Sequence, residues 1–246
     1  MNLILLQKSE VDEAGRAVLA DERARHMRKI LKAEAGRRVR IGLLNGPLGE
    51  GTVESVQRGE VILRCVFEES VPPRPSVDLV LAMPRPKVMK RLWPQLAALG
   101  VDRIVLIRAA KVERYYFDSH VLEPEFYETQ LIEGLQQARC TQLPEVRVEP
   151  LFKPFVEDEM EGLFAGSLKL LADPSGEKLL DEIIPKETPP ERAVLAIGPE
   201  GGWTPFELDK LQAGGFNLFG MGKRILRTDT ATVALLAQLA GLVRGD

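Results

Sequence analysis

Two glycine-rich segments near the carboxyl end contain residue types that suit a ligand pocket. The first follows an apolar run at residues 193–197 and contains Gly198, Gly201 and Gly202. Glycine accepts positive φ and lets a ligand approach the backbone, so this loop suits a planar or adenosine-like group at the carboxyl edge of a parallel sheet. It lacks the P-loop and dinucleotide patterns, which disfavours a phosphate ligand, and Glu200 favours a hydroxyl-rich or cationic one. A turn that needs glycine only for steric reasons is the alternative.

A helix start directly after this loop specifies its geometry. Thr204 is the expected N-cap, Pro205 occupies the first helical position, and Glu207 completes a capping box. The pattern predicts a helix over residues 204–213. Trp203, between loop and helix, is expected either to stack on a base or to pack in the interior.

The second segment repeats this design, with an apolar run at residues 216–219 before its glycines. Thr228 or Asp229 is the expected N-cap of an apolar helix over residues 230–243, which belongs to the core or to a subunit interface. Two such loops in succession predict one shared pocket. Its apolar wall for an adenine would come from Met221, Ile225 and Leu226.

Arg227 and Asp229 place opposite charges at this helix start, where they could serve in a reaction. A surface ion pair beside a core helix is the alternative for the two residues. Asp229 has a further alternative, because aspartate is among the best N-caps.

Basic residues concentrate in two segments, although 33 Lys and Arg against 36 Asp and Glu give a formal net charge of -3. Nine cations accompany three acids between residues 16 and 40. Eight cations, Arg85, Lys87, Lys90, Arg91, Arg103, Arg108, Lys111 and Arg114, accompany two acids between residues 84 and 114. The total excludes a uniformly basic coat, but the two segments are expected to line one phosphate-contacting groove. A solvated helix surface is the alternative.

A proline-rich linker at residues 71–75 separates two kinds of pattern, and we place the domain boundary there, with domains at residues 1–72 and 73–246. The first domain has a predicted helix over residues 21–32, with Asp21 as N-cap. Short strands separated by turn signals between residues 37 and 67 predict a small antiparallel sheet or barrel.

The second domain alternates buried-type strands with helices, which predicts an α/β fold with a mostly parallel sheet covered on both faces. The expected strands are residues 77–83, 104–107, 168–172, 193–197 and 216–219, and the expected helices are residues 88–99, 123–139, 204–213 and 230–243.

Composition limits the class of protein. The 246 residues are 45% apolar, enough for a large core, and the two cysteines, Cys65 and Cys140, are too few for a disulfide framework or a Cys-rich metal site. We expect a reducing, cytoplasmic environment, no metal and no membrane partner, because signal-peptide features are lacking and no apolar run approaches the roughly 20 residues that cross a bilayer.

The two loops together resemble a known family. Residues 198–202 (Gly-Pro-Glu-Gly-Gly) and 222–231 (Gly-Lys-Arg-Ile-Leu-Arg-Thr-Asp-Thr-Ala) are similar to the motifs of the 16S rRNA uridine-N3 methyltransferases of the SPOUT superfamily. The resemblance extends through residues 26–32, Lys87, residues 99–101, and Gln136 with Arg139, so it covers most of the chain. It departs at Ala98 and Leu135, where the family commonly has Glu.

The resemblance implies an N-terminal PUA-like β-barrel that helps to hold RNA and a C-terminal Rossmann-like domain with a trefoil knot. It also implies S-adenosylmethionine as methyl donor, a homodimer, and a target uridine in the decoding region of the 16S rRNA in the small ribosomal subunit. The implied cofactor-binding residues are Leu195, Ile197, Gly198, Pro199, Glu200, Gly201, Gly202, Leu218, Gly220, Met221, Gly222, Ile225, Leu226, Thr230 and Ala231.

Methyl transfer to uridine N3 needs a base to remove the N3 proton and a cation to stabilise the resulting anion. Asp229 is the candidate base or water-orienting group, and Arg227 and Arg139 are the candidate cations. The expected RNA contacts are Arg23, Arg25, His26, Arg28, Lys29, Lys32, Lys87 and Arg224. A SPOUT methyltransferase acting on another rRNA or tRNA position, and a non-catalytic RNA-binding assembly factor, are the alternative functions.

Overall fold

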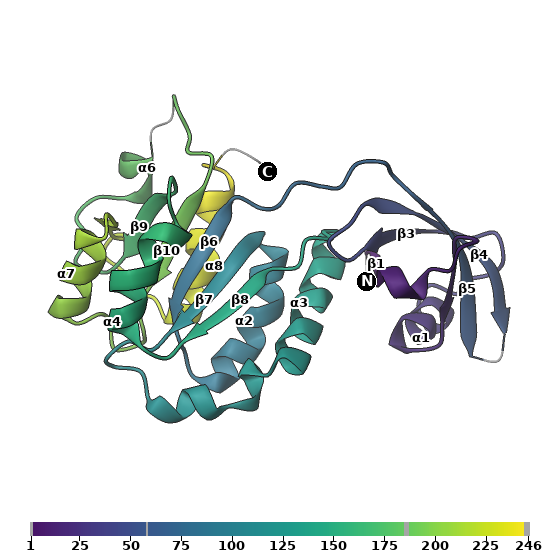
Figure 1. Cartoon of the computed structure of the whole chain (residues 1–246), viewed down its shortest axis with the longest axis horizontal. Helices are drawn as coiled ribbons and strands as arrows, with labels where there is room; N and C mark the ends of the chain where they lie inside the picture. The colour runs from purple at the N-terminus through teal and green to yellow at the C-terminus, as the bar shows by residue number, and fades with distance from the viewer. Residues whose placement is uncertain (1, 58, 185–186, 244–246) are drawn as a thin grey trace. The chain divides into compact units, whose positions relative to one another are not determined.

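The computed structural model describes residues 2–57, 59–184 and 187–243. It divides into two compact units: unit 1 contains Met1–Arg74 and Ile132–Leu143, and unit 2 contains Pro75–Leu131 and Pro144–Asp246. Figure 1 labels their helices and strands. Among the described residues, no helix has both the length and the low polarity needed to cross a membrane.

Unit 1 is built on a five-stranded sheet in the order β1-β3-β4-β5-β2. Its strands are β1 (Ile4–Leu6), β2 (Arg16–Leu19), β3 (Arg38–Leu43), β4 (Leu48–Gln57) and β5 (Glu60–Phe67). The predicted antiparallel pairing between residues 37 and 67 is confirmed, since β3 pairs with β4 and β4 with β5 in that sense. The sequence did not predict β1, which pairs parallel with β3, or β2.

Helix α1 (Glu22–Lys29) packs its apolar residues into the core of unit 1, where Ala24 and Met27 are fully buried. Asp21 caps the helix as predicted, because its carboxylate accepts the N–H of Arg23 at 2.9 Å. The predicted end at residue 32 is wrong, because α1 ends at Lys29 and Lys32 has a φ of 48°.

Residues 132–143 lie far beyond the predicted linker in sequence but belong to unit 1, to which backbone hydrogen bonds attach them. The N–H of Leu3 donates to the carbonyl of Gln136 at 3.1 Å, and the N–H of Asn45 donates to the carbonyl of Thr141 at 2.7 Å. The expected single continuous domain at residues 73–246 is therefore interrupted. Helix α3 (Pro124–Ala138) contributes its last residues to this interruption.

Unit 2 has the predicted α/β architecture, with a six-stranded parallel sheet in the order β11-β9-β10-β6-β7-β8. Its strands are β6 (Val77–Ala82), β7 (Val101–Ile107), β8 (Glu145–Glu149), β9 (Leu168–Ala172), β10 (Ala193–Ile197) and β11 (Asn217–Phe219). Every residue of β6 and β10 is buried, which explains why both strands are apolar in the sequence except for the buried Asp78 of β6.

Helices cover both faces of this sheet (Figure 1). Helices α2 (Pro86–Ala98), α7 (Pro205–Ala213) and α8 (Thr228–Ala240) match predicted helices, with ends shifted by at most three residues. The shorter helical segments are η1 (Lys8–Glu10), η2 (Arg114–Asp118), η3 (His120–Leu122), α4 (Phe152–Pro154), η4 (Phe155–Glu159), α5 (Met160–Leu163) and α6 (Leu180–Ile183).

Candidate functional site

Three adjacent strands of unit 2 end at the same edge of the sheet and place the two glycine-rich loops together. Strand β9 lies between β11 and β10, and all three run in parallel. The loops after their carboxyl ends therefore emerge side by side, as is usual for ligand sites in parallel sheets. The predicted neighbourhood of the two glycine-rich loops follows from this strand order.

Both loops line one cavity of about 310 Å³, as the prediction of a shared pocket requires. This volume falls within the range of pockets that hold small-molecule ligands. The lining residues are Ala172, Asp173, Pro174, Ile197, Gly198, Pro199, Glu200, Gly202, Trp203, Met221, Gly222, Arg224, Ile225, Leu226, Arg227, Thr228, Ala231 and Leu235.

Hydrogen bonds hold the first loop at both of its ends. The hydroxyl of Thr228, in the first turn of α8, donates to the carbonyl of Gly198 at 3.4 Å. At the other end Thr204 and Glu207 form the predicted capping box of α7. The buried carboxylate of Glu207 also accepts the N–H of Ala110 at 2.6 Å, which ties the loop after β7 to the start of α7. The cavity wall is therefore anchored to three elements of unit 2.

The glycines of the two loops serve different purposes. Gly202 and Gly222 have φ values of 71° and 83°, and no atom outside their neighbours lies within 4 Å of their ideal Cβ positions. These two glycines leave open backbone at the cavity. Gly220, by contrast, is packed against Gly176, whose carbonyl oxygen would lie 2.4 Å from a Cβ at position 220. Glycine is needed there because two chain segments cross closely.

Trp203 forms a buried part of the cavity wall and is 5% exposed. Its indole N–H has no hydrogen-bond partner among the described residues. The ring packs against the backbone of Gly198 and lies 6.3 Å from the ring of Phe152, measured between centroids. Of the two predicted roles, packing in the interior is the one that this geometry provides.

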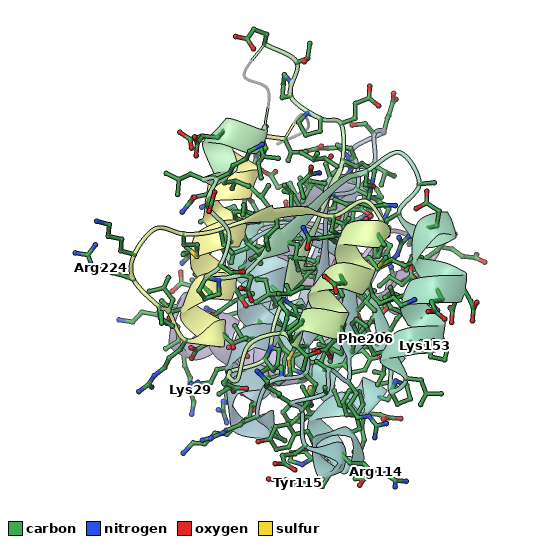
Figure 2. The ribbon with its side chains drawn as sticks, turned by 90° about the vertical axis from the view of Figure 1, so that its left-hand side faces the viewer. Lys29, Arg114, Tyr115, Lys153, Phe206 and Arg224 are labelled. Carbon is green, nitrogen blue, oxygen red and sulfur yellow. The ribbon has the colours of Figure 1, made fainter. Side chains whose placement is uncertain are left out.

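The cavity has charged groups of both signs. Asp173 and Glu200 supply carboxylates, and Arg224 and Arg227 supply guanidinium groups. Figure 2 shows Arg224 extending outward from the loop that leads into α8. In the described part of the chain, no cluster of three or more His, Cys, Asp or Glu side chains is placed to hold a metal ion.

Asp229 occupies the first turn of α8 but is not its N-cap. The N-cap is Arg227, whose side chain makes no capping hydrogen bond, so both predicted caps, Thr228 and Asp229, are wrong. The carboxylate of Asp229 instead accepts a hydrogen bond from Arg91 of α2 at 3.2 Å. Asp229 does not line the cavity, so its role as a base stays a prediction.

Ten of the residues predicted to bind the cofactor line the cavity, and five do not: Leu195, Gly201, Leu218, Gly220 and Thr230. Leu195 is fully buried in β10, and Gly201 faces Lys111, whose ammonium donates to the Gly201 carbonyl at 2.7 Å. Asp173, which follows β9, also lines the cavity and was not among the residues predicted from the sequence. The signal was available, since β9 was predicted and the residues after a parallel strand lie at the carboxyl edge.

Arg139 belongs to unit 1, where it follows the last residue of α3 with a φ of 62°. Glycine is the usual residue in this left-handed position after a helix, so arginine is strained there. Its side chain lines a groove of about 340 Å³ together with Arg40 of the same unit. Its proposed action on the substrate stays a prediction.

The basic residues of α1 and of the turn that follows it fall into two groups. Arg25, Arg28, Lys29 and Lys32 are exposed and His26 is half-buried, so they remain candidate RNA contacts. Arg23 is different, because its guanidinium is ion-paired with Glu10 and Asp21 and donates to the carbonyl of Leu5 at 2.7 Å. With its side chain 18% exposed, Arg23 holds unit 1 together, and its role as an RNA contact stays a prediction.

The second basic segment is also divided. Lys87 on α2 is exposed and keeps its predicted role, and Arg224 lines the cavity. Arg103 lies in β7 and forms ion pairs with Asp78 and Glu145, so it is not available to the expected phosphate groove.

The comparisons with known proteins agree with this geometry. A family model described as an RNA methyltransferase domain matches residues 72–240. The ribosomal RNA small subunit methyltransferase E of Treponema pallidum is 33% identical over 96% of this chain and 90% of that protein. The ribosomal RNA small subunit methyltransferase E 1 of Borreliella burgdorferi is 27% identical over 95% of each chain.

A solved structure has the same fold. The ribosomal RNA small subunit methyltransferase E of Neisseria gonorrhoeae, bound to S-adenosyl methionine, superposes with a TM-score of 0.77 at 20% identity, covering 99% of this chain and 98% of that one. The fold, the match over residues 72–240 and the identity to the Treponema protein lead to one conclusion. This chain belongs to the ribosomal RNA small subunit methyltransferase E family and carries its RNA methyltransferase domain.

Proposed function

We propose that this chain transfers a methyl group from S-adenosylmethionine to N3 of a uridine in the 16S rRNA of the small ribosomal subunit. The observation that carries the proposal is the single cavity enclosed by both glycine-rich loops inside the RNA methyltransferase domain. The names of the relatives supply the class of substrate, and the resemblance of the loop motifs supplies the atom that is methylated.

The cavity residues fit S-adenosylmethionine in size, shape and polarity. Ile197, Met221 and Leu226 provide apolar surface for an adenine, and the open backbone at Gly202 and Gly222 lets a nucleoside approach closely. The unpartnered indole N–H of Trp203 leaves a hydrogen-bond donor in the wall of the cavity. The carboxylates and guanidinium groups at the cavity suit a molecule with a positive sulfonium and amino group and a negative carboxylate.

The bound cofactor supplies an electrophilic methyl group, and the side chains of this chain must prepare the nucleophile. Uridine N3 carries a proton, so a base must remove it while a cation stabilises the negative charge on the flanking carbonyl oxygens. Arg227 lines the cavity and is our candidate for that cation, with Arg139 as a second one. Asp229 is our candidate base or water-orienting residue, and Arg91 orients its carboxylate.

Unit 1 is proposed to hold the RNA. Exposed cations on α1 bind phosphates, and the target base must be unpaired or flipped because N3 lies on the Watson-Crick edge. Following the family resemblance, we also propose a PUA-like barrel for unit 1, a trefoil knot in unit 2, a homodimer and action in the cytoplasm. Leu235, Leu236 and Leu239 are buried within the chain, so a dimer contact would use other residues of α8.

The decisive experiment is nucleoside mass spectrometry of rRNA from a strain that lacks this gene. Loss of 3-methyluridine from 16S rRNA, restored by the wild-type gene, is the expected result. Loss of a modification from tRNA or from another rRNA position would refute the uridine assignment. Calorimetry with S-adenosylmethionine tests the catalytic reading separately, since a non-catalytic assembly factor would show no binding.

A further inference from the structure

An exposed tyrosine marks a surface of unit 2 outside the cavity. Tyr115, in the short helix η2 after β7, is 63% exposed, an unusual degree for a large aromatic side chain. Figure 2 shows Tyr115 and Arg114 projecting from the same end of the unit 2 ribbon. An aromatic ring beside a free cation is the combination that single-stranded nucleic acids bind.

The ring of Tyr115 is held in place by its neighbour. Tyr116 contacts it edge to face, with centroids 4.9 Å apart and planes at 86°. Such a contact covers at most one face of the Tyr115 ring, so a face is left for stacking. A hydrogen bond with Tyr116 raises the pKa of the Tyr115 hydroxyl, while the charge of Arg85 acts in the opposite direction. Geometry also places Arg85 beside this loop, because Arg85 and Lys111 bond to the consecutive residues Glu200 and Gly201.

The cations around Tyr115 are not neutralised. Arg85 and Arg114 are exposed, and neither side chain forms an ion pair within residues 2–57, 59–184 and 187–243. Arg91, in the same basic segment, is by contrast paired with Asp229. Glu113 is the one acid within the loop that joins β7 to η2. An unneutralised pair of guanidinium groups suits an anionic partner, and the exposed ring of Tyr115 beside them can stack on a base, so the combination favours single-stranded RNA.

This surface is connected to the first glycine-rich loop. Lys111, four residues before Tyr115, donates to the carbonyl of Gly201 at 2.7 Å. The N–H of Arg85 makes a long hydrogen bond of 3.5 Å to the carboxylate of Glu200. Glu200 lines the cavity, so a strand bound at Tyr115 would lie beside the site of methyl transfer.

We propose that Arg85, Arg114 and Tyr115 form a docking surface for the single-stranded RNA that flanks the methylated base. An unpaired base stacks on the ring of Tyr115, and the two guanidinium groups bind the adjoining phosphates. The proposal rests on the proposed function, because it assigns part of the substrate to a surface next to the same cavity.

The test compares Tyr115→Ala with Tyr115→Phe, using a short fluorescein-labelled single-stranded RNA in anisotropy titrations. Loss of stacking in Tyr115→Ala should weaken binding by about fivefold or more, whereas Tyr115→Phe keeps the ring and should bind like the wild type. Arg114→Ser and Arg85→Ser should each lower the slope of log K against log salt by about 0.7, the value for one phosphate of a single strand.

Phe206→Ala is the matched control. Phe206 is also an exposed aromatic residue, 52% exposed, but Lys210, the cation beside its ring, is paired with Glu157. The RNA affinity of the Phe206→Ala variant should equal that of the wild type. Equal losses in Tyr115→Ala and Phe206→Ala would overturn the proposal, and so would wild-type RNA affinity in Tyr115→Ala.

Two further results separate this surface from the proposed function. S-adenosylmethionine affinity by calorimetry should be the same in the Tyr115 variants and the wild type, and the KM for small ribosomal subunits should rise in Tyr115→Ala with little change in kcat. Unchanged RNA binding with weakened binding to whole subunits would indicate a ribosomal protein as partner and overturn the proposal. Absence of cofactor binding in the wild type would refute the proposed function itself.

Discussion

Replacing Gly198 with alanine tests how closely the cavity wall is packed. The backbone of Gly198 is not in the left-handed region, so alanine adds a methyl group without backbone strain. That methyl would lie 2.9 Å from Nε1 of Trp203 and 3.1 Å from two further atoms of the ring. Ordinary contact begins at 3.4 Å, so the indole must retreat by roughly 0.5 Å.

The size of the effect of Gly198→Ala depends on how little space surrounds Trp203. The side chain is 5% exposed and lies against Phe152, so its retreat displaces other packed groups. Overpacking of this kind costs about 1–3 kcal/mol, and we expect the free energy of unfolding to fall by that amount. Because Gly198 and Trp203 both line the cavity, we also expect S-adenosylmethionine affinity to fall by about tenfold, equivalent to ~1.4 kcal/mol.

The assay is chemical denaturation together with calorimetry of S-adenosylmethionine, on four proteins of a double-mutant cycle. Trp203→Leu removes the atoms that clash, so the double variant should be more stable than the sum of the two single changes predicts, by at least about 0.5 kcal/mol. Gly162→Ala is the control, because no atom lies within 4 Å of its ideal Cβ. Additive behaviour, or a wild-type affinity in Gly198→Ala, would refute this account of the wall.

Three other predictions concern catalysis, the second loop and unit 1. Asp229→Asn should keep the fold and cofactor affinity but lower single-turnover methylation by about 100-fold or more; near-full activity would remove Asp229 from the role of base. Gly222→Ala and Gly166→Ala should each cost about 1 kcal/mol in unfolding free energy, because both glycines have positive φ, but only Gly222→Ala should weaken cofactor binding in calorimetry. The hydrogen bond from Arg23 lowers the pKa of Glu10 in the folded protein below its ordinary value of 4.5. The ionised carboxylate therefore stabilises unit 1 above pH 4.5, and this stabilisation is lost as the pH falls through the lower pKa of the folded state. Glu10→Gln should therefore cost about 1–3 kcal/mol near neutral pH and little in strong acid, and a pH-independent loss in denaturation curves would contradict this.

The sequence predicted the buried strands well, because burial on both faces makes nearly every residue of such a strand apolar. The predicted strands at residues 168–172 and 193–197 have the same bounds as β9 and β10. Strand β8 was missed because it lies at the edge of the sheet and alternates charged residues with Val146 and Val148. An edge strand is partly exposed, so its pattern is not that of a buried run.

Helix ends and domain limits were less predictable, because they depend on contacts that are distant in sequence. Thr228 looks like an N-cap in the sequence, but its hydroxyl bonds to Gly198 and its backbone is already helical in α8. Likewise, the apolar spacing of residues 123–139 predicts α3 correctly without indicating that its last residues belong to unit 1. Local sequence patterns therefore identify helices and strands, whereas the contacts that these elements make depend on residues distant in sequence.

The same holds for the charged residues: the sequence gives their positions along the chain, but the fold determines their ion pairs and their exposure. Arg23 and Arg28 are five residues apart on one basic helix, yet Arg23 is used by Glu10 and Asp21 while Arg28 is exposed. Asp173 carried no recognisable motif, but the placement of β9 between β10 and β11 brings it to the cavity. Strand order thus determines which carboxylate can reach a ligand, and ion pairing determines which cation remains for RNA. Both follow from long-range packing, so the variants that test them must be chosen from the structure.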